Sequence, residues 1–400
     1  MSSKGSIAIV SGARTPLGRY CGKLKDFTCQ DLAAVAAVEA IKRSGVGPEE
    51  IEHVVLGNAQ QTNGDAPYAA RHAALKAGIP IATPAVSVNR LCGSGIEAIV
   101  CGARMIQLGE AKYVLAGGTE AMSQAPHAVR GMRWGVGLGE GKLDDTLMAV
   151  LTDSYANLPM GMTAELYGKQ QGITREEMDE FALSSQQKAA AAQAGGRLVD
   201  EIVPVPLRNR RGEPTGEVFD QDDHLRPETT IESLKKLKPV FSKEGTVTAG
   251  NASGIVDGAA AVVLTTMAEA ERRQLNPMGR IVSWGIAGVD PKIMGCGPVP
   301  ASKLALDSAG LKLDDIDLIE LNEAFAAQAL GVVKETGFPM EKLNVNGGAI
   351  ALGHPLGATG TRLVITVLNE LRRRKAKYGL ATACIGGGQG ITMIVENLQR

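Results

Sequence analysis

The chain has 400 residues, of which 44% are hydrophobic, with 42 basic and 43 acidic side chains and a formal net charge of -1. This length supports at least two hydrophobic cores, and the balanced charge argues against nucleic acid or an anionic membrane surface as the main partner. The longest uncharged run, residues 379–395, is interrupted by glycines and is shorter than the ~20 apolar residues that a membrane-spanning helix needs. No membrane span is therefore predicted.

The cysteines and the N-terminus bear on metal sites and on the compartment. Six cysteines show neither CxxC spacing nor a nearby histidine pair, so neither a metal site nor a disulfide framework is predicted. Residues 1–12 read as a strand and not as a signal peptide, which makes the cytoplasm the expected location. The mitochondrial matrix stays open, because an import signal can be weak and uncleaved.

In chain order, the apolar pattern alternates runs of strand length with runs of helical periodicity. Such alternation is typical of α/β folds and implies a mostly parallel sheet. The sequence predicts strands within residues 1–12, 51–56, 248–264 and 316–321, and helices at residues 31–44, 95–109, 174–194, 301–309 and 361–374.

Two stretches of the chain, roughly 260 residues apart, carry nearly the same pattern. In order and in character, the first copy matches the second as follows: 49–59 with 314–324, 86–95 with 343–357, and 109–118 with 375–388. A weaker match pairs residues 9–11 with residues 281–283, each reading Ile-Val-Ser. The repeat predicts two related α/β halves, and its period is far too long for a solenoid.

The segment between the copies holds most of the charged helix-like sequence and several polar turns. We therefore predict an N-terminal half at residues 1–120 that is completed by 249–272, an inserted domain at 121–248, and a C-terminal half at 273–400. Insertions between duplicated halves often close over a ligand site. The inserted domain is thus expected to cover the site.

Cys92 is the candidate nucleophile. It stands directly before Gly93-Ser94-Gly95 and an apolar helix, so its sulfur is expected near free N–H groups and a helix dipole that favour a thiolate. The flanking glycines are expected to let a substrate reach the backbone. The alternative is a buried, inert cysteine, which stays the interpretation for Cys101 in mid-helix.

His354 is the candidate general base. It lies in the second-copy block that corresponds to the Cys92 block, with glycines on both sides and Pro355 after it. If the halves pack about a pseudo-twofold axis, the two blocks meet near that axis and the imidazole comes within reach of the thiol. A simple turn residue is the alternative.

Two more polar positions follow apolar strands in the second copy. Cys384 precedes three glycines whose N–H groups can form an anion-binding nest, and a thiol there suits a proton donor and acceptor. The amide of Asn322 is a candidate for fixing a water or polarising a carbonyl, although a helix cap beside a packing aromatic is the commoner fate of such a motif.

Together these groups predict acyl transfer through a thioester, with a separate proton shuttle for a carbon acid. A papain-like protease needs one thiol, its base and an oxyanion site. The second thiol is therefore surplus to hydrolysis.

Five motifs, NRLCGSG, TAGNASG, NEAF, NVNGGAIALGHPLGATG and CIGGGQG, occur in this order, and the chain resembles the thiolases over residues 7–395. Within the family it is most similar to the mitochondrial-type 3-ketoacyl-CoA thiolases of fatty-acid oxidation, from residues 151–165 and 224–230. The resemblance implies the thiolase fold, with duplicated α/β halves in a layered αβαβα arrangement and an inserted loop domain, assembled as a homodimer or homotetramer. It implies an acyltransferase that cleaves 3-ketoacyl-CoA with CoA to acetyl-CoA and a shortened acyl-CoA, and that catalyses the reverse Claisen condensation.

The family's catalytic roles are carried over residue by residue. Cys92 matches the acylated nucleophile, His354 the base that activates it, and Cys384 the residue that moves the proton on the acetyl α-carbon. Asn322 matches the residue that holds a water, which with His354 stabilises the enolate oxygen. The backbone N–H groups of Cys92 and Gly386 match a second oxyanion site.

The resemblance also implies where the substrates bind. No permanently bound cofactor and no metal are implied, and coenzyme A and acyl-CoA are substrates. Arg226 and Thr229 are expected near the nucleotide, Ser253 near the pantetheine and Met160 in the pocket loop. Acetoacetyl-CoA-preferring thiolases commonly carry a histidine before the Met-Gly of that loop, whereas this chain has Pro159, which favours a broader acyl range.

Three alternatives accompany this reading. A biosynthetic acetoacetyl-CoA thiolase is the close variant. A catalytically silent CoA carrier would be expected to lose Cys92, His354 or Cys384, and all three are present. A decarboxylating condensing enzyme fits badly, because a thiol stands where its second histidine belongs.

Overall fold

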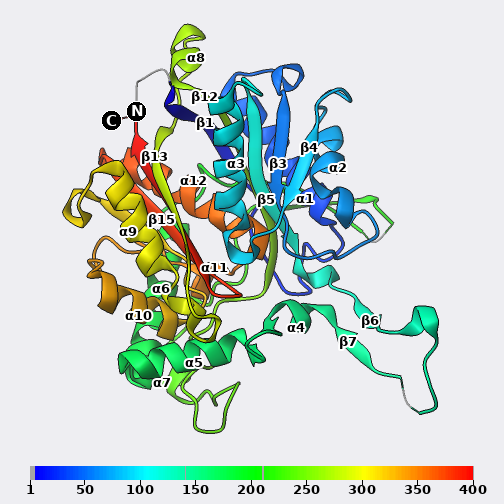
Figure 1. Ribbon diagram of the computed structural model, residues 1–400, viewed down its shortest axis with the longest axis vertical. Helices are drawn as coiled ribbons and strands as arrows, with labels where there is room; N and C mark the ends of the chain where they lie inside the picture. The colour runs from blue at the N-terminus through cyan, green and yellow to red at the C-terminus, as the bar shows by residue number, and fades with distance from the viewer. Residues whose placement is uncertain (1–4, 140, 210, 400) are drawn as a thin grey trace.

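The computed structural model describes residues 5–139, 141–209 and 211–399. Its layers follow from the hydrophobic cores (Figure 1). Helices α1 (Cys29–Ser44) and α2 (Ala69–Lys76) pack on the outer face of the first-half strands, and α9 (Pro298–Ala309) and α10 (Ala326–Thr336) pack on the outer face of the second-half strands. Helices α3 (Ser94–Leu108) and α12 (Leu356–Arg374) lie in the central core between them. This confirms the layered αβαβα arrangement.

The strands form one hydrogen-bonded path in the order β14-β15-β16-β13-β1-β12-β5-β3-β4, with β2 pairing β12 beside it. The halves join where β1 pairs with β13 through Ala8–Arg280 and Ile9–Gly279. The bounds are β1 Ile7–Arg14, β2 Gly18–Arg19, β3 His53–Gly57, β4 Ala85–Val88, β5 Val114–Ala121, β12 Val256–Thr266, β13 Gly279–Gly288, β14 Leu318–Leu321, β15 Tyr378–Ile385 and β16 Gln389–Asn397.

The prediction of a mostly parallel sheet is wrong. Along this path only β3–β4, β3–β5 and β14–β15 are parallel, and the remaining pairs are antiparallel. In each half, helical crossovers connect the outer, parallel strands. A long strand then pairs antiparallel with its neighbour, β12 with β5 in the first half and β16 with β15 in the second. Strand–helix alternation reports the crossovers and misses these returns.

The weak Ile-Val-Ser match marks a structural equivalence between the halves. The register of β1 shifts between Ile9 and Ser11, and that of β13 shifts between Ile281 and Ser283, so each strand carries a bulge at the same place. Ser11 donates to the carbonyl of Ala40 in α1 at 2.6 Å, and Ser283 donates to the carbonyl of Ala305 in α9 at 2.7 Å. Each bulge therefore turns a serine onto the helix that covers its strand.

The central helices touch backbone to backbone. A Cβ added at Gly95 would lie 2.5 Å from the nitrogen of Thr361, and one added at Gly360 would lie 2.5 Å from the nitrogen of Ile96. Thr361 also donates to the carbonyl of Gly95 at 3.1 Å. Gly95 was expected to open the backbone to a substrate, but its role here is to let α3 and α12 cross.

The segment at 121–248 packs against both halves. Val205 and Phe219, in the hairpin of β10 (Val205–Arg208) and β11 (Pro214–Phe219), join the core under α1, whereas α5 (Met160–Gln171) and α6 (Arg175–Ala194) join the core around α10. Its other regular elements are β6 His127–Val129, β7 Leu143–Asp145, α4 Thr146–Val150, β8 Thr152–Asp153, β9 Leu158–Pro159 and α7 Ile231–Lys235, and short helices α8 (Met267–Arg272) and α11 (Ala349–Leu352) lie in the halves. The boundaries of the inserted domain stay a prediction.

Candidate active site

Cys92 lies in a tight turn in front of α3. The turn is a short 3-10 helix, Leu91–Gly93, and α3 begins at Ser94. Leu91 has a φ of 44°, an unusual value for a residue with a side chain. His354 likewise precedes Leu356, the first residue of α12, by two positions. Cys92 and His354 thus occupy matching places before the two crossing helices.

Two backbone N–H groups converge on the Cys92 sulfur. They belong to Cys92 itself and to Gly386, which follows β15, and both act to lower the pKa of the thiol. Burial acts more strongly and raises this pKa to about 11, although the residue as a whole keeps some contact with solvent. The expectation of a thiolate at the helix start is therefore wrong, because burial keeps the thiol neutral at pH 7.

His354 is hydrogen-bonded at both ring nitrogens, which fixes its tautomer. Nδ1 lies 2.6 Å from Thr359 Oγ1, whose own proton is directed to the carbonyl of Pro355 at 3.0 Å. Thr359 must then accept from an Nδ1–H, so Nε2 carries the lone pair, 3.3 Å from the Asn322 amide nitrogen that donates to it. Burial, followed by the charge of Arg362, lowers the pKa of His354 to about 3. The imidazole is therefore neutral, and Nε2, whose lone pair is directed at the Asn322 amide, is the ring nitrogen that can accept a proton.

Asn322 leaves a polar atom without a partner. Its backbone N–H donates to the carbonyl of Thr382 at 2.9 Å, which fixes the residue at the end of β14. The side chain is fully buried, and its Oδ1 has no hydrogen-bond partner among the described residues. Such an unpaired buried oxygen costs about 1–3 kcal/mol. It suits a water or a polar group of a ligand.

Cys384 is the second thiol of the site. It is the penultimate residue of β15, is fully buried, and packs in a cluster with Met294, Ala324 and Met160. Burial and then the nearby Cys92 raise the pKa of its thiol well above the usual value. A protonated thiol in an apolar setting can give a proton to carbon and take it back.

Sequence reasoning missed Glu120, which supports the same loops. Its carboxylate is fully buried at the end of β5 and accepts N–H groups from Ala59 at 3.0 Å, Gln60 at 3.0 Å and Gly357 at 2.8 Å, and the amide of Asn58 at 2.9 Å. It therefore joins the end of β3 to the start of α12. Thr359 was missed as well; it stands within the quoted GHPLGATG motif, and its i+5 spacing from His354 on a helix start is the signal that could have found it.

The residues expected to bind CoA fall into two places. Arg226 and Thr229 line a cavity of about 510 Å³ with His224, Gln186 and residues after β11. Ser253 lies instead beside the site, where its N–H donates to the carbonyl of Ala324 at 3.0 Å. Met160 begins α5 beside Gly386, since a Cβ on that glycine would lie 3.2 Å from the Met160 sulfur. The structure thus separates the cavity at Arg226 and Thr229 from the groups around the thiols.

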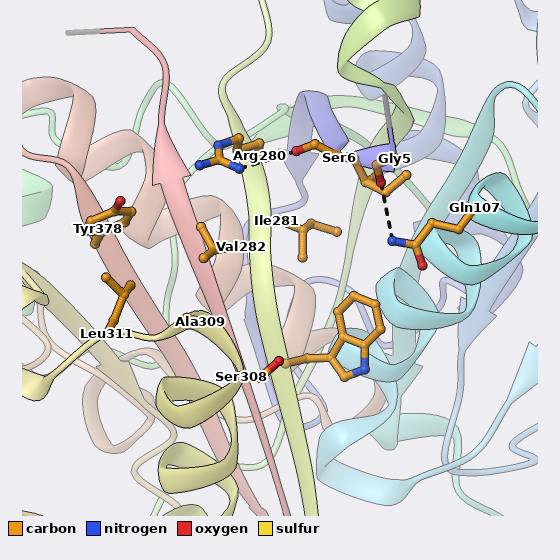
Figure 2. A pocket seen from close by; sticks show the side chains of 12 residues that line it. Gly5, Ser6, Gln107, Arg280, Ile281, Val282, Ser308, Ala309, Leu311 and Tyr378 are labelled. Carbon is orange, nitrogen blue, oxygen red and sulfur yellow. Dashed lines mark hydrogen bonds between the residues drawn. The ribbon is translucent and has the colours of Figure 1, made fainter. Parts of the chain in front are cut away.

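A different cavity lies away from this chemistry. It measures about 310 Å³ and is lined by residues such as Ser6, Gln107, Arg280, Ile281 and Tyr378, which Figure 2 shows around the join of the two halves. None of the predicted site residues lines it. Among the described residues no cluster of ligating side chains could hold a metal ion, and no helix is long and apolar enough to cross a membrane.

Comparison with known proteins shows the family of the chain. The family model "Thiolase, N-terminal domain" matches residues 7–268 and "Thiolase, C-terminal domain" matches residues 275–397. The chain is 50% identical to the mitochondrial 3-ketoacyl-CoA thiolase of Homo sapiens over 392 residues, 98% of both chains, and 50% identical to an acetyl-CoA acetyltransferase of Rhizobium meliloti (strain 1021) over 397 residues, 99% of this chain and 100% of that one. The crystal structure of the human mitochondrial 3-ketoacyl-CoA thiolase in complex with CoA superposes with a TM-score of 0.95 at 49% identity, covering 98% of both chains. The chain belongs to the thiolase family.

Proposed function

We propose that this thiolase cleaves 3-ketoacyl-CoA with CoA, releasing acetyl-CoA and an acyl-CoA shortened by two carbons, and that it runs the reverse Claisen condensation at the same site. The observation that carries the proposal is the pair of thiols, Cys92 and Cys384, which lie close enough for their charges to interact, together with a neutral His354 whose Nε2 lone pair is directed at the amide of Asn322. Hydrolysis needs one thiol; transfer of an acyl group with protonation of a carbon acid needs both.

The proposed roles follow the chemistry of each group. His354 takes the thiol proton of Cys92 as the sulfur attacks the keto carbon, and the tetrahedral oxyanion collapses to the acyl-enzyme as the bond to the acetyl-CoA α-carbon breaks. Cys384 protonates that carbon. Asn322, through a water, and His354 stabilise the enolate oxygen, and the N–H groups of Cys92 and Gly386 hold the oxyanion of the thioester steps. CoA then takes the acyl group from Cys92.

CoA is proposed to run from the cavity at Arg226 and Thr229 to the thiols, with Ser253 beside the pantetheine and Met160 beside the acyl group. Arg226 is exposed at the mouth of the cavity, where a guanidinium suits a phosphate or a nucleobase. The human relative crystallised with CoA supports this ligand.

Two variants test the mechanism. Cys92→Ser is expected to lose acyl-enzyme formation with acetyl-CoA. Cys384→Ser is expected still to acylate Cys92 but to fail in exchanging the acetyl α-protons with solvent deuterium. Intact-protein mass spectrometry reads the first outcome and NMR the second. Cleavage of acetoacetyl-CoA by Cys384→Ser at the parent rate would defeat the two-thiol mechanism.

The preferred chain length is proposed to extend beyond four carbons, with a role in fatty-acid β-oxidation. Pro159, in place of a histidine before Met160-Gly161, supports this preference. Sequence identity does not distinguish a broad-range thiolase from a biosynthetic acetoacetyl-CoA thiolase, because a 3-ketoacyl-CoA thiolase and an acetyl-CoA acetyltransferase are both 50% identical to this chain. Measuring kcat/KM for acetoacetyl-CoA and for a 3-ketooctanoyl thioester distinguishes them. Turnover of the shorter substrate alone would favour the biosynthetic enzyme.

The oligomer and the compartment are part of the same proposal. A homodimer or homotetramer is supported by β4, whose outer edge is unpaired among the described strands, and by the exposed Met132, Trp134 and Leu138 between β6 and β7. Light scattering on the protein as it elutes from a size-exclusion column gives its mass and so the number of subunits. A cytoplasmic location is proposed, with the mitochondrial matrix as the alternative that the mitochondrial relatives support.

A further inference from the structure

The side chain of Arg90 joins the two turns that meet at Cys92. Its Nε donates to Glu97 Oε2 in α3 at 2.9 Å, and its Nη1 donates to Gln389 Oε1, at the start of β16, at 2.7 Å. Arg90 and Gln389 are 299 residues apart in the chain. One guanidinium thus links the nucleophile turn of the first half to the glycine turn of the second.

The nucleophile turn is stiff within itself. Leu91 sits at a φ of 44° and is held there because its N–H donates to Asn89 Oδ1 at 2.9 Å. The N–H of Arg90 donates to Ser94 Oγ at 2.8 Å, and that hydroxyl donates to the carbonyl of Leu91 at 2.7 Å. Displacing Arg90 therefore displaces the turn as a unit.

The glycine turn carries the second oxyanion donor. Gly387 and Gly388 have φ values of 81° and 82°, and the carbonyl of Gly388 accepts the N–H of Val289 at 2.8 Å. Leu91 packs on Gly386, where a Cβ would lie 3.2 Å from Leu91 Cδ1. Such apolar contact sets a closest approach without a preferred direction. The pairing of Ile385 with Gln389 closes the turn, and the Arg90–Gln389 hydrogen bond adds a directional link between this turn and the nucleophile turn.

We propose that Arg90 is a positioning residue for acyl transfer, which holds Gln389 so that the N–H of Gly386 points at the same place as the N–H of Cys92. The inference rests on the proposed function, in which these two N–H groups stabilise the oxyanion. Hydrogen-bond strength falls steeply with distance and angle, so a small shift of Gly386 weakens the oxyanion site. Arginine suits the role because its planar fork reaches two acceptors at once, as lysine does not.

The test is a double-mutant cycle of Arg90→Met and Gln389→Met, with Arg104→Met as the matched control. Arg104 also approaches Glu97, at 3.7 Å, and lies 5.7 Å over the Trp284 ring, but makes no hydrogen bond to Gln389. Single-turnover acetylation of Cys92 by acetyl-CoA, the KM for CoA and the thermal unfolding midpoint are measured for each protein.

Each single variant of the cycle is expected to acetylate Cys92 about 10- to 100-fold more slowly than the parent. This loss of rate is at most that expected from removing one complete oxyanion donor. The KM for CoA is expected to stay within about twofold of the parent value. The double variant is expected to acetylate Cys92 at a rate within about threefold of that of the slower single variant, because both substitutions break the same hydrogen bond. Arg90→Lys is expected to fall between the parent and Arg90→Met.

Acetylation by Arg90→Met at the parent rate, or losses that multiply in the double variant, would overturn the positioning role. So would losses that follow the unfolding midpoint in all variants, Arg104→Met included, since that pattern indicates loss of structure alone. If the parent protein forms no adduct on Cys92, the proposed function itself fails. If the parent protein forms the adduct and Arg90→Met forms it at the same rate, the positioning role fails and the proposed function stands.

Discussion

Replacing Arg14 by methionine is expected to remove about 5 kcal/mol of stability. Arg14 is fully buried; its Nε donates to Glu201 at 2.7 Å, and its Nη1 and Nη2 donate to Asp222 at 2.7 and 2.9 Å. Methionine fills similar space but leaves both buried carboxylates without their cation. Breaking one buried ion pair costs about 3–5 kcal/mol, and the loss of a cation shared by two acids places the effect at the upper end.

The substitution is also expected to affect the cavity proposed for CoA, because Asp222 lies just before the residues that line it. Asp222 accepts the N–H of Leu17 at 2.7 Å and precedes His224, a lining residue, by two positions. A loosened Asp222 is expected to raise the KM for CoA before kcat falls. Steady-state kinetics with CoA as the varied substrate, below the temperature at which the variant unfolds, measures this.

The assay for stability is urea unfolding followed by circular dichroism, with Arg272→Met as the control. Arg272 also pairs with a glutamate, Glu269 at 2.6 Å, but its side chain is 62% exposed and solvent screens the pair, so its replacement is expected to change the stability little. A loss below about 1 kcal/mol for Arg14→Met as well would refute the reasoning that the buried charges depend on each other.

Three further predictions concern the site itself. Thr359→Val removes the acceptor that fixes the His354 tautomer and is expected to lower kcat about 10- to 100-fold with an unchanged KM for CoA. Thr359→Ser keeps the acceptor and is expected to retain most of the parent kcat. Equal losses of kcat in both variants would contradict the tautomer argument. Glu120→Gln places an amide N–H2 against at least one pair of backbone or amide donors and is expected to destabilise the protein by about 1–3 kcal/mol on thermal unfolding; an unchanged midpoint would mean that these donors find other acceptors. Because burial raises the pKa of the Cys92 thiol to about 11, alkylation of Cys92 by iodoacetamide without substrate is expected to keep rising between pH 7 and 10, since the thiolate fraction grows about tenfold per pH unit below the pKa, and a plateau below pH 9 would contradict it.

The candidate site could be predicted from the sequence where local context marks a residue. Cys92, His354 and Cys384 each stand beside glycines at a strand or helix end, and the repeat indicated that the first two meet. The structure places both two residues before the crossing helices α3 and α12. Layering follows from the same signal, because amphipathic helices alternating with apolar strands leave few ways to bury both.

The parts that could not be predicted depend on partners far apart in the chain. Arg90 meets Gln389 across 299 residues, and Glu120 meets Gly357 across 237, and neither spacing carries a periodic signal. The neutral thiol of Cys92 was also unpredictable, because the helix dipole is visible in the sequence whereas the desolvation that outweighs it is not. The prediction of parallel strands was wrong for a related reason: a strand that pairs antiparallel has the same apolar run in the sequence as one that pairs parallel.

The proposed function places one active site in a duplicated chain, so the corresponding place in the first copy should be closed, and the strand registers show how the chain fills it. Leu56 pairs with Gly117 in the first half as Leu321 pairs with Thr382 in the second, so Gly57 corresponds to Asn322 and Thr119 to Cys384. A Cβ on Gly57 would lie 2.7 Å from the main-chain carbon of Ser94, which leaves no room for an asparagine.

The other corresponding position is closed by a hydrogen bond. Thr119 is fully buried, and its hydroxyl donates to the carbonyl of Cys29 in α1 at 2.7 Å, so the atom that would face a substrate is engaged with the outer helix. The first half therefore keeps Cys92 at its helix start but has filled the space in which an amide and a second thiol would have to act. Restoring Asn and Cys at these two positions would not create a second site, because α3 and α1 already occupy it.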